Sequence, residues 1–124
     1  MAKPKFTFGV AGLVNSVYQS MFGKNVPDSF LNDREDYIQN IEKGKITPEQ
    51  FMENVFLSSE VESKELSNEA FLKLIFKAME VKKPDEADYS YWLSRFETRS
   101  RRGVLLGVML TKYWTGFCEK YEVR

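Results

Sequence analysis

Histidine is absent from this sequence, and cysteine occurs once, as Cys118. The lack of histidine excludes Ser-His and Cys-His nucleophile–base pairs and any histidine-ligated metal site. A single cysteine cannot form an intrachain disulfide, and we interpret Cys118 as a buried structural thiol, with a reactive thiol as the alternative. No spacing singles out a catalytic pair among the 18 acidic residues. We therefore predict that the protein is not an enzyme and that it uses no cofactor and no metal.

The sequence also lacks a long apolar run, since the longest, residues 104–110, is interrupted by Gly107. A membrane-spanning helix needs about 20 apolar residues, so no membrane span is predicted. Residues 1–8 lack the apolar core of a secretory signal. We expect an extracellular or cell-surface location only as part of a larger polypeptide, and a cytoplasmic location stays open.

Neither charge is in excess, because Lys and Arg balance Asp and Glu and the formal net charge is zero. This balance argues against nucleic acid as a partner. The charges are unevenly distributed, however. Residues 28–66 hold ten acidic and four basic side chains, whereas residues 67–124 hold eight acidic and eleven basic ones. Attraction between the two halves is the simplest interpretation.

The apolar residues that are present recur every three or four positions, which is the spacing of one face of a helix, and no segment alternates like a strand. We predict an all-α fold, a compact bundle of six or seven short helices. It forms a single domain over residues 10–124, after an extended or disordered segment 1–9. An aromatic content of 15% predicts a core rich in rings. The polar residues 58–66 are interpreted as a hinge.

The clearest helix start lies at Thr47. Gly44 can end the preceding helix in a left-handed conformation, and Pro48 suits a first helical position. Gln50 stands three residues after Thr47, which is the spacing of a capping box. Ser67 and Ser100 are predicted to cap later helices in the same way.

The two halves match each other in sequence. Tyr37 aligns with Trp92, and the Pro-Asp pair at 27–28 aligns with the pair at 84–85, at offsets of 55 and 57 residues. We interpret this as an old duplication, with one repeat at about 10–61 and the other at about 67–124. The prediction is that the two units superpose and that Tyr37 and Trp92 are buried at equivalent places.

The order of these residues resembles the bacterial family called domain of unknown function 4214 and, more weakly, the helical domain of phycobilisome linkers. The residues that carry the resemblance are Tyr18, Phe22-Gly23-Lys24, Pro27-Asp28, Tyr37, Ile41, Gly44, Phe56, Ser58 and Glu60 in the first repeat, and Phe76, Pro84-Asp85, Tyr91-Trp92 and Phe96 in the second. The resemblance implies a helical module of large bacterial exported and surface-associated proteins, found beside carbohydrate-active domains and without catalytic residues of its own.

The candidate binding site is a cluster of four arginines, Arg95, Arg99, Arg101 and Arg102, near the expected helix start at Ser100. Guanidinium groups beside free helix amides suit phosphate, sulfate or carboxylate groups. A solvated helix face is the alternative. We interpret Trp92 as a core residue, although a stacking platform is also considered, and Tyr91 as the better candidate for a surface contact.

Acidic residues are concentrated in one further stretch. Asp28, Asp33, Glu35 and Asp36 lack calcium-loop spacing and are interpreted as a solvated helix face. We expect the protein to act as an attachment module that binds a glycan or envelope polymer through the four arginines and Tyr91. The alternative is a structural linker that contacts a protein partner or associates with itself.

Overall fold

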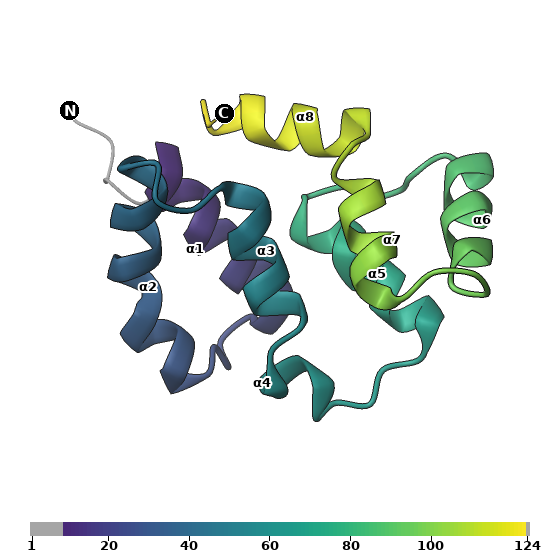
Figure 1. Cartoon of the computed structure of the whole chain (residues 1–124), viewed down its shortest axis with the longest axis horizontal. Coiled ribbons are helices and arrows are strands. Elements are labelled where there is room, and N and C mark those ends of the chain that lie inside the picture. Colours follow the sequence, from purple (N-terminus) through teal and green to yellow (C-terminus); the bar gives the residue numbers. More distant parts are fainter. Residues whose placement is uncertain (1–8, 124) are drawn as a thin grey trace.

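The computed structural model describes residues 9–123, and these residues form eight α-helices without any strand among them (Figure 1). The all-α prediction is confirmed. The helices are α1 (Gly9–Phe22), α2 (Asp28–Glu42), α3 (Pro48–Phe56), α4 (Ser59–Glu62), α5 (Asn68–Ala78), α6 (Glu86–Arg95), α7 (Arg101–Val108) and α8 (Lys112–Lys120). The prediction for residues 1–9 lies outside the described residues, except for Gly9, which begins α1.

The predicted hinge at residues 58–66 contains one more helix than the sequence suggested, the single turn α4. The Ser58 hydroxyl caps it by accepting a hydrogen bond from the Val61 amide at 3.3 Å. Val61 in turn is buried in the core, with 3% of its surface exposed. One buried side chain and one cap therefore give a helical turn to a segment that composition indicated as a polar connection, and the hinge itself stays a prediction.

The apolar spacing of residues 104–113 predicts one helix that includes Tyr113, followed by a short helix capped by Thr115, and the structure places this boundary elsewhere. Helix α7 instead ends at Val108, and α8 begins at Lys112. The Thr111 hydroxyl donates a hydrogen bond to the Val108 carbonyl at 2.6 Å, which helps to close the turn between them. Because apolar spacing continues through residues 104–113, the pattern alone hides this break.

The predicted caps at Thr47, Ser67 and Ser100 are confirmed. Thr47 and Gln50 form the complete capping box, with the Gln50 amide 3.0 Å from the Thr47 hydroxyl and the Thr47 amide 2.9 Å from the Gln50 side-chain oxygen. Ser67 and Ser100 each accept a hydrogen bond from the backbone amide three residues later. Gly44 has a φ of +75°, the left-handed conformation expected after a helix.

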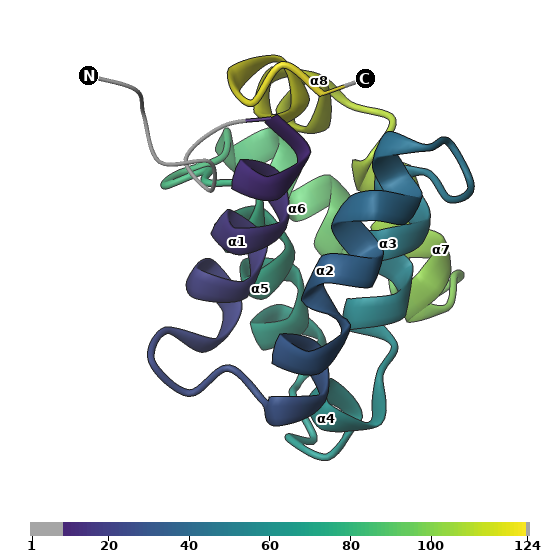
Figure 2. The same ribbon diagram turned by 90° about the vertical axis from the view of Figure 1, so that its left-hand side faces the viewer.

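The eight helices pack as two halves joined at a seam. Helix α1 packs against α2 and α5, α3 packs against α7, and α6 packs against α5 and α7. Figure 1 shows α1–α4 on one side and α5–α7 on the other, with α8 lying across the top, and Figure 2 shows α1 and α5 side by side. The pairs α1 with α5 and α3 with α7 are the equivalent helices of the predicted repeats. Such pairs meet where two like units face each other about a two-fold axis, but the duplication itself stays a prediction.

The core is rich in rings, as predicted. The Phe56 and Phe71 rings meet edge to face across the seam, with centroids 5.7 Å apart. Phe71 also contacts Phe96, and Tyr18 stacks on Phe30. Every described helix contributes at least one buried residue. Aromatic packing thus joins the halves as well as filling them.

Helix α8 is tied down by a polar network around Glu80, which follows α5. The Glu80 carboxylate accepts hydrogen bonds from Ser16 on α1 and from Lys120 and Tyr121 at the end of α8. Burial of this carboxylate would raise its pKa, but the hydrogen bonds from Lys120, Ser16 and Tyr121 outweigh burial and lower it. The network therefore favours ionised Glu80 and connects three segments of the chain.

Candidate functional site

The four arginines of the predicted cluster have different surroundings. Arg101 is directed toward the loop that precedes α5. Its guanidinium donates hydrogen bonds to the Leu66 carbonyl, at 2.5 Å, and to the Asn68 side chain, at 3.2 Å, and it lies 4.8 Å from the centre of the Phe71 ring. These contacts fasten the loop to α7, so Arg101 is engaged in the fold.

Arg102 joins α7 to α3. Its Nε lies 2.6 Å from a carboxylate oxygen of Glu53, and its own side chain is largely exposed. A surface ion pair of this kind stabilises the fold by at most about 1 kcal/mol. The Glu53 carboxylate nevertheless offsets the positive charge of Arg102, so Arg102 attracts an external anion less strongly.

Arg95 and Arg99 remain together near the end of α6. The Arg95 guanidinium lies over the Tyr91 ring, 4.8 Å from its centre, and 47% of the Tyr91 surface is exposed. Arg99 is exposed, and its guanidinium has no ion pair or hydrogen bond within residues 9–123. We call Tyr91, Arg95 and Arg99 the arginine–tyrosine surface.

The orientation of this surface follows from the packing of its neighbours. Trp92 points inward and is buried, with 9% of its surface exposed, so the prediction that it is a core residue is confirmed. Its ring lies over Gly107 of α7, and an Arg99 nitrogen lies near the same glycine. The one-turn spacing of Gly103 and Gly107 predicts the close approach of another helix backbone, but at Gly107 it is the Trp92 ring that approaches.

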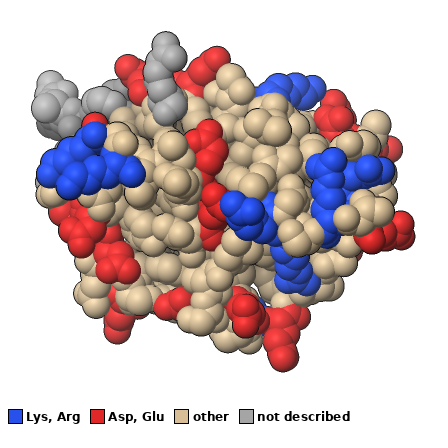
Figure 3. Space-filling model, in the orientation of Figure 1, with Lys and Arg blue, Asp and Glu red and all other residues tan. Residues whose placement is uncertain are grey.

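Basic side chains are visible over α6 and α7 in the space-filling view, with acidic ones among them (Figure 3). The predicted solvated acidic face is confirmed, because Asp28, Asp33, Glu35 and Asp36 are all exposed on α2. Many of the unevenly distributed charged side chains therefore lie on the surface, and only some of them form contacts between the two halves.

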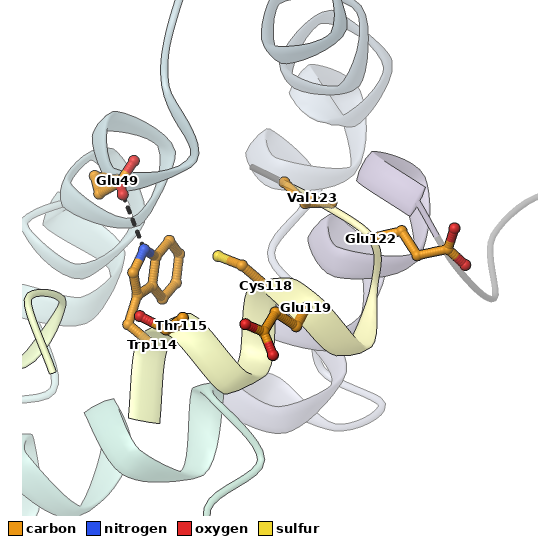
Figure 4. A pocket seen from close by; sticks show the side chains of 7 residues that line it. All are labelled: Glu49, Trp114, Thr115, Cys118, Glu119, Glu122 and Val123. Carbon is orange, nitrogen blue, oxygen red and sulfur yellow. Dashed lines mark hydrogen bonds between the residues drawn. The ribbon is translucent and has the colours of Figure 1, made fainter. Parts of the chain in front are cut away.

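A hollow of about 550 Å³ lies between the start of α3 and α8 (Figure 4). Trp114 of α8 donates a hydrogen bond from its indole nitrogen to Glu49 of α3, at 2.9 Å. Cys118 lies on the same side of α8 and faces the hollow, while the Glu122 carboxylate points away from the Trp114 ring. Glu49 thus has a structural partner already.

Cys118 has the chemistry of a structural thiol. Burial, with a contribution from the Glu49 carboxylate, raises the pKa of this thiol to about 12. Nucleophilic cysteines need a lowered pKa, because the thiolate is the reactive form. The interpretation of Cys118 as buried is confirmed.

A second concave surface was missed by the sequence reasoning. Met21 at the end of α1, together with Leu66, Ala70 and Leu74, lines an apolar groove of about 340 Å³, and the lining also includes three exposed lysines, Lys64, Lys73 and Lys77. We call it the lysine-edged groove. The spacing of Lys73 and Lys77, one turn apart beside Ala70 and Leu74, is the sequence signal that could have indicated it.

The described residues contain no group of three or more His, Cys, Asp or Glu side chains placed to hold a metal ion. Across residues 9–123, no helix is both long and apolar enough to cross a membrane.

Comparison of the chain with protein-family models, with curated proteins and with solved structures finds no match. The resemblance to the 4214 family and to phycobilisome linkers therefore stays a prediction.

Proposed function

We propose that this chain is a non-catalytic helical attachment module that binds an anionic ligand, such as a sulfated or uronic-acid glycan or another envelope polymer, at the arginine–tyrosine surface. The observation that carries the proposal is the exposed Arg99 guanidinium, which has no side-chain partner in the described chain, beside Arg95 stacked on Tyr91. Guanidinium forks match the oxygens of sulfate and carboxylate groups, and an exposed ring offers an apolar face to a sugar.

The site is smaller than the sequence suggested. Arg101 and Arg102 are held by Leu66, Asn68 and Glu53, so exposed Arg99 and half-buried Arg95 are the two of the four whose guanidinium groups have no hydrogen bond or ion pair within residues 9–123. A two-guanidinium site favours repeated ligands, in which several weak contacts add along a polymer. Attachment, which tolerates weak individual contacts, fits this arrangement better than tight binding of a single small anion.

The non-catalytic part of the proposal is supported by the chemistry of Cys118. Its raised pKa keeps the only thiol of the chain neutral. The resemblance to the 4214 family supports a role in a bacterial exported or surface-associated protein. That context would supply the extracellular polymers that the arginine–tyrosine surface is proposed to bind.

The test is a titration of the protein with sulfated and uronic-acid polysaccharides at several salt concentrations. Arg99→Ala should weaken binding, and binding by the native protein should fall with added salt, because exposed charges are screened over about 8–10 Å at physiological ionic strength. Arg99→Lys keeps the charge but loses the fork, so it should recover only part of the affinity.

Lys45→Ala is the matched control, since it removes the same charge from an exposed position in the loop between α2 and α3, outside the arginine–tyrosine surface. Equal affinities for Arg99→Ala and Lys45→Ala would show that only general charge matters. No binding of any polymer by the native protein would reject attachment through this surface.

A further inference from the structure

The lysine-edged groove combines an apolar floor with charge of a single sign. Its charged lining residues are Lys64, Lys73 and Lys77, all exposed. Lys73 has a carboxylate nearby, that of Glu69 at 3.6 Å, but both side chains are more than half exposed, so this pair contributes little. The groove therefore matches a ridge that carries an apolar side chain between acidic ones.

The first half of α2 is such a ridge. Leu31 is one of four large apolar residues that are exposed within residues 9–123, with 45% of its surface accessible. Asp28 stands three residues before Leu31 and Glu35 four residues after it, so both carboxylates flank it on the same helix face. Arg34, three residues after Leu31, reaches the Asn15 side chain of α1 at 3.4 Å. Figure 3 shows acidic side chains over α2, on the left of the molecule.

The two surfaces lie at the same end of the molecule. The Phe22 ring at the end of α1 contacts the Phe30 ring of α2, with centroids 5.4 Å apart, and the Lys64 nitrogen lies 5.9 Å from the centre of the same Phe22 ring. Phe30 precedes Leu31, and Lys64 is part of the groove lining. The ridge and the groove are therefore neighbours that one partner can contact together.

We propose that the partner is a second copy of this chain, bound so that the ridge around Leu31 of each copy fills the lysine-edged groove of the other. A two-fold arrangement makes the same contact twice and closes the assembly as a dimer. Leu31 would enter the apolar floor, while Asp28 and Glu35 would face the lysines. A formal net charge of zero leaves no overall repulsion between copies.

A second copy fits these surfaces better than a membrane does. A membrane contact uses a projecting apolar face with basic residues around it, whereas here the apolar residues line a concave groove. The reciprocal contact also uses the exposed Leu31 and its flanking carboxylates, which an anionic membrane would repel. An acidic segment of another protein would fill the groove but leave this ridge unused.

The test is sedimentation velocity across a range of protein concentrations at low salt. The native chain should approach twice the monomer mass as concentration rises, and added salt should weaken the association. Lys73→Glu with Lys77→Glu should weaken it more than tenfold, because both reciprocal contacts then oppose like charges. Lys82→Glu with Lys83→Glu reverses two exposed lysines outside the groove and should leave the dimer intact.

A charge exchange separates a specific contact from damage to the fold. The variant Asp28→Lys with Glu35→Lys should also be monomeric, since its basic ridge faces a basic groove. Mixed with the Lys73→Glu, Lys77→Glu variant, it should form a heterodimer, because each ridge then meets a groove of opposite charge. Circular dichroism of each variant alone checks that it is folded.

Several results would overturn the proposal. They are a native chain that stays monomeric at millimolar concentration, groove variants that still dimerise, or a mixture of the two charge variants that stays monomeric. Binding of an acidic helical peptide or of anionic vesicles to a monomeric native chain, lost in the Lys73→Glu, Lys77→Glu variant, would assign the groove to that ligand instead.

Discussion

The contact between Trp92 and Gly107 makes a quantitative prediction for Gly107→Ala. A Cβ atom at position 107 would lie 2.5 Å from two outer atoms of the Trp92 ring. Carbon atoms in contact normally lie about 3.5–4.0 Å apart, so the ring or α7 would have to move by about 1 Å or more. Trp92 is buried, and overpacking of this kind typically costs about 1–3 kcal/mol. Replacing a glycine inside a helix with alanine stabilises the helix by about 0.5–1 kcal/mol, and this gain offsets part of the overpacking cost.

Gly116→Ala provides the matched control. Gly116 lies inside α8, and a Cβ atom built there has nothing within 4 Å, so only the helical gain applies. We expect Gly116→Ala to stabilise the protein by about 0.5–1 kcal/mol and Gly107→Ala to be about 1–3 kcal/mol less favourable than Gly116→Ala. Urea denaturation followed by circular dichroism measures both. In a Trp92→Phe background, which removes the outer ring atoms, Gly107→Ala should lose most of its penalty. Equal effects of the two alanines in the native background would refute the reasoning.

Three further predictions concern Thr47, Glu80 and Cys118. Thr47→Ala removes the capping hydroxyl and should lower the free energy of unfolding by about 0.5–2 kcal/mol in urea, and an unchanged midpoint would mean that tertiary packing holds the start of α3. Because the pKa of Glu80 is lowered in the folded chain, its stabilisation is present above the ordinary pKa of 4.5 and is lost as pH falls through the folded value. At pH 7 the free energy of unfolding of Glu80→Gln should therefore be about 1.5–3 kcal/mol lower than that of the native chain. This difference should shrink as the solution is made acidic. A difference that does not depend on pH would contradict an ionised Glu80 in the network. With a pKa of about 12, Cys118 carries about a thousandfold less thiolate than an ordinary cysteine at pH 8. A thiol reagent should therefore label the native protein far more slowly than the urea-denatured protein. Equal labelling rates would contradict the burial of Cys118.

Helix starts were the most predictable part of the fold. Thr47, Ser67 and Ser100 each satisfy a backbone amide only three residues away, so the signal and its partner lie within one short stretch of sequence. Apolar periodicity likewise reports a local property, the side of a helix that faces the core. Features decided within one turn could therefore be predicted without knowing the fold.

The two errors in the helix pattern have a shared cause. Helix α4 is a single turn that would not be stable alone, and it depends on Val61 reaching a core built by distant residues. Tyr113 fits the apolar stripe of the preceding helix but instead lies on α8, where its hydroxyl donates a hydrogen bond to Asp88 at 2.7 Å. In both places tertiary contacts decide the local structure.

The candidate site likewise combines a local feature that the sequence predicts with long-range contacts that it does not. The sequence identifies where four arginines are concentrated, but the partners of Arg101 and Arg102 lie 35 and 49 residues away, at Leu66 and Glu53. Only the fold determines which guanidinium groups have a hydrogen-bond or ion-pair partner within the described chain and which do not. The lysine-edged groove was missed for a related reason, because Met21 joins it from the end of α1, far from α5 in the sequence.

The same long-range contacts bear on the predicted repeat. Thr47 and Ser100 occupy the N-cap positions of α3 and α7, and the seventh residues after them are Asn54 and Gly107. The Tyr37 hydroxyl lies close enough to the Asn54 side chain to interact with it, whereas the Trp92 ring lies over Gly107. The aromatic residue of the second helix in each half thus meets the same position of the third helix. In the second half the larger Trp92 ring faces a residue without a side chain, which is the compensation expected under close packing if the predicted duplication is real. A glycine retained only for helix flexibility would carry no such relation to Trp92, so the cost of Gly107→Ala, and its removal by Trp92→Phe, distinguishes the two explanations.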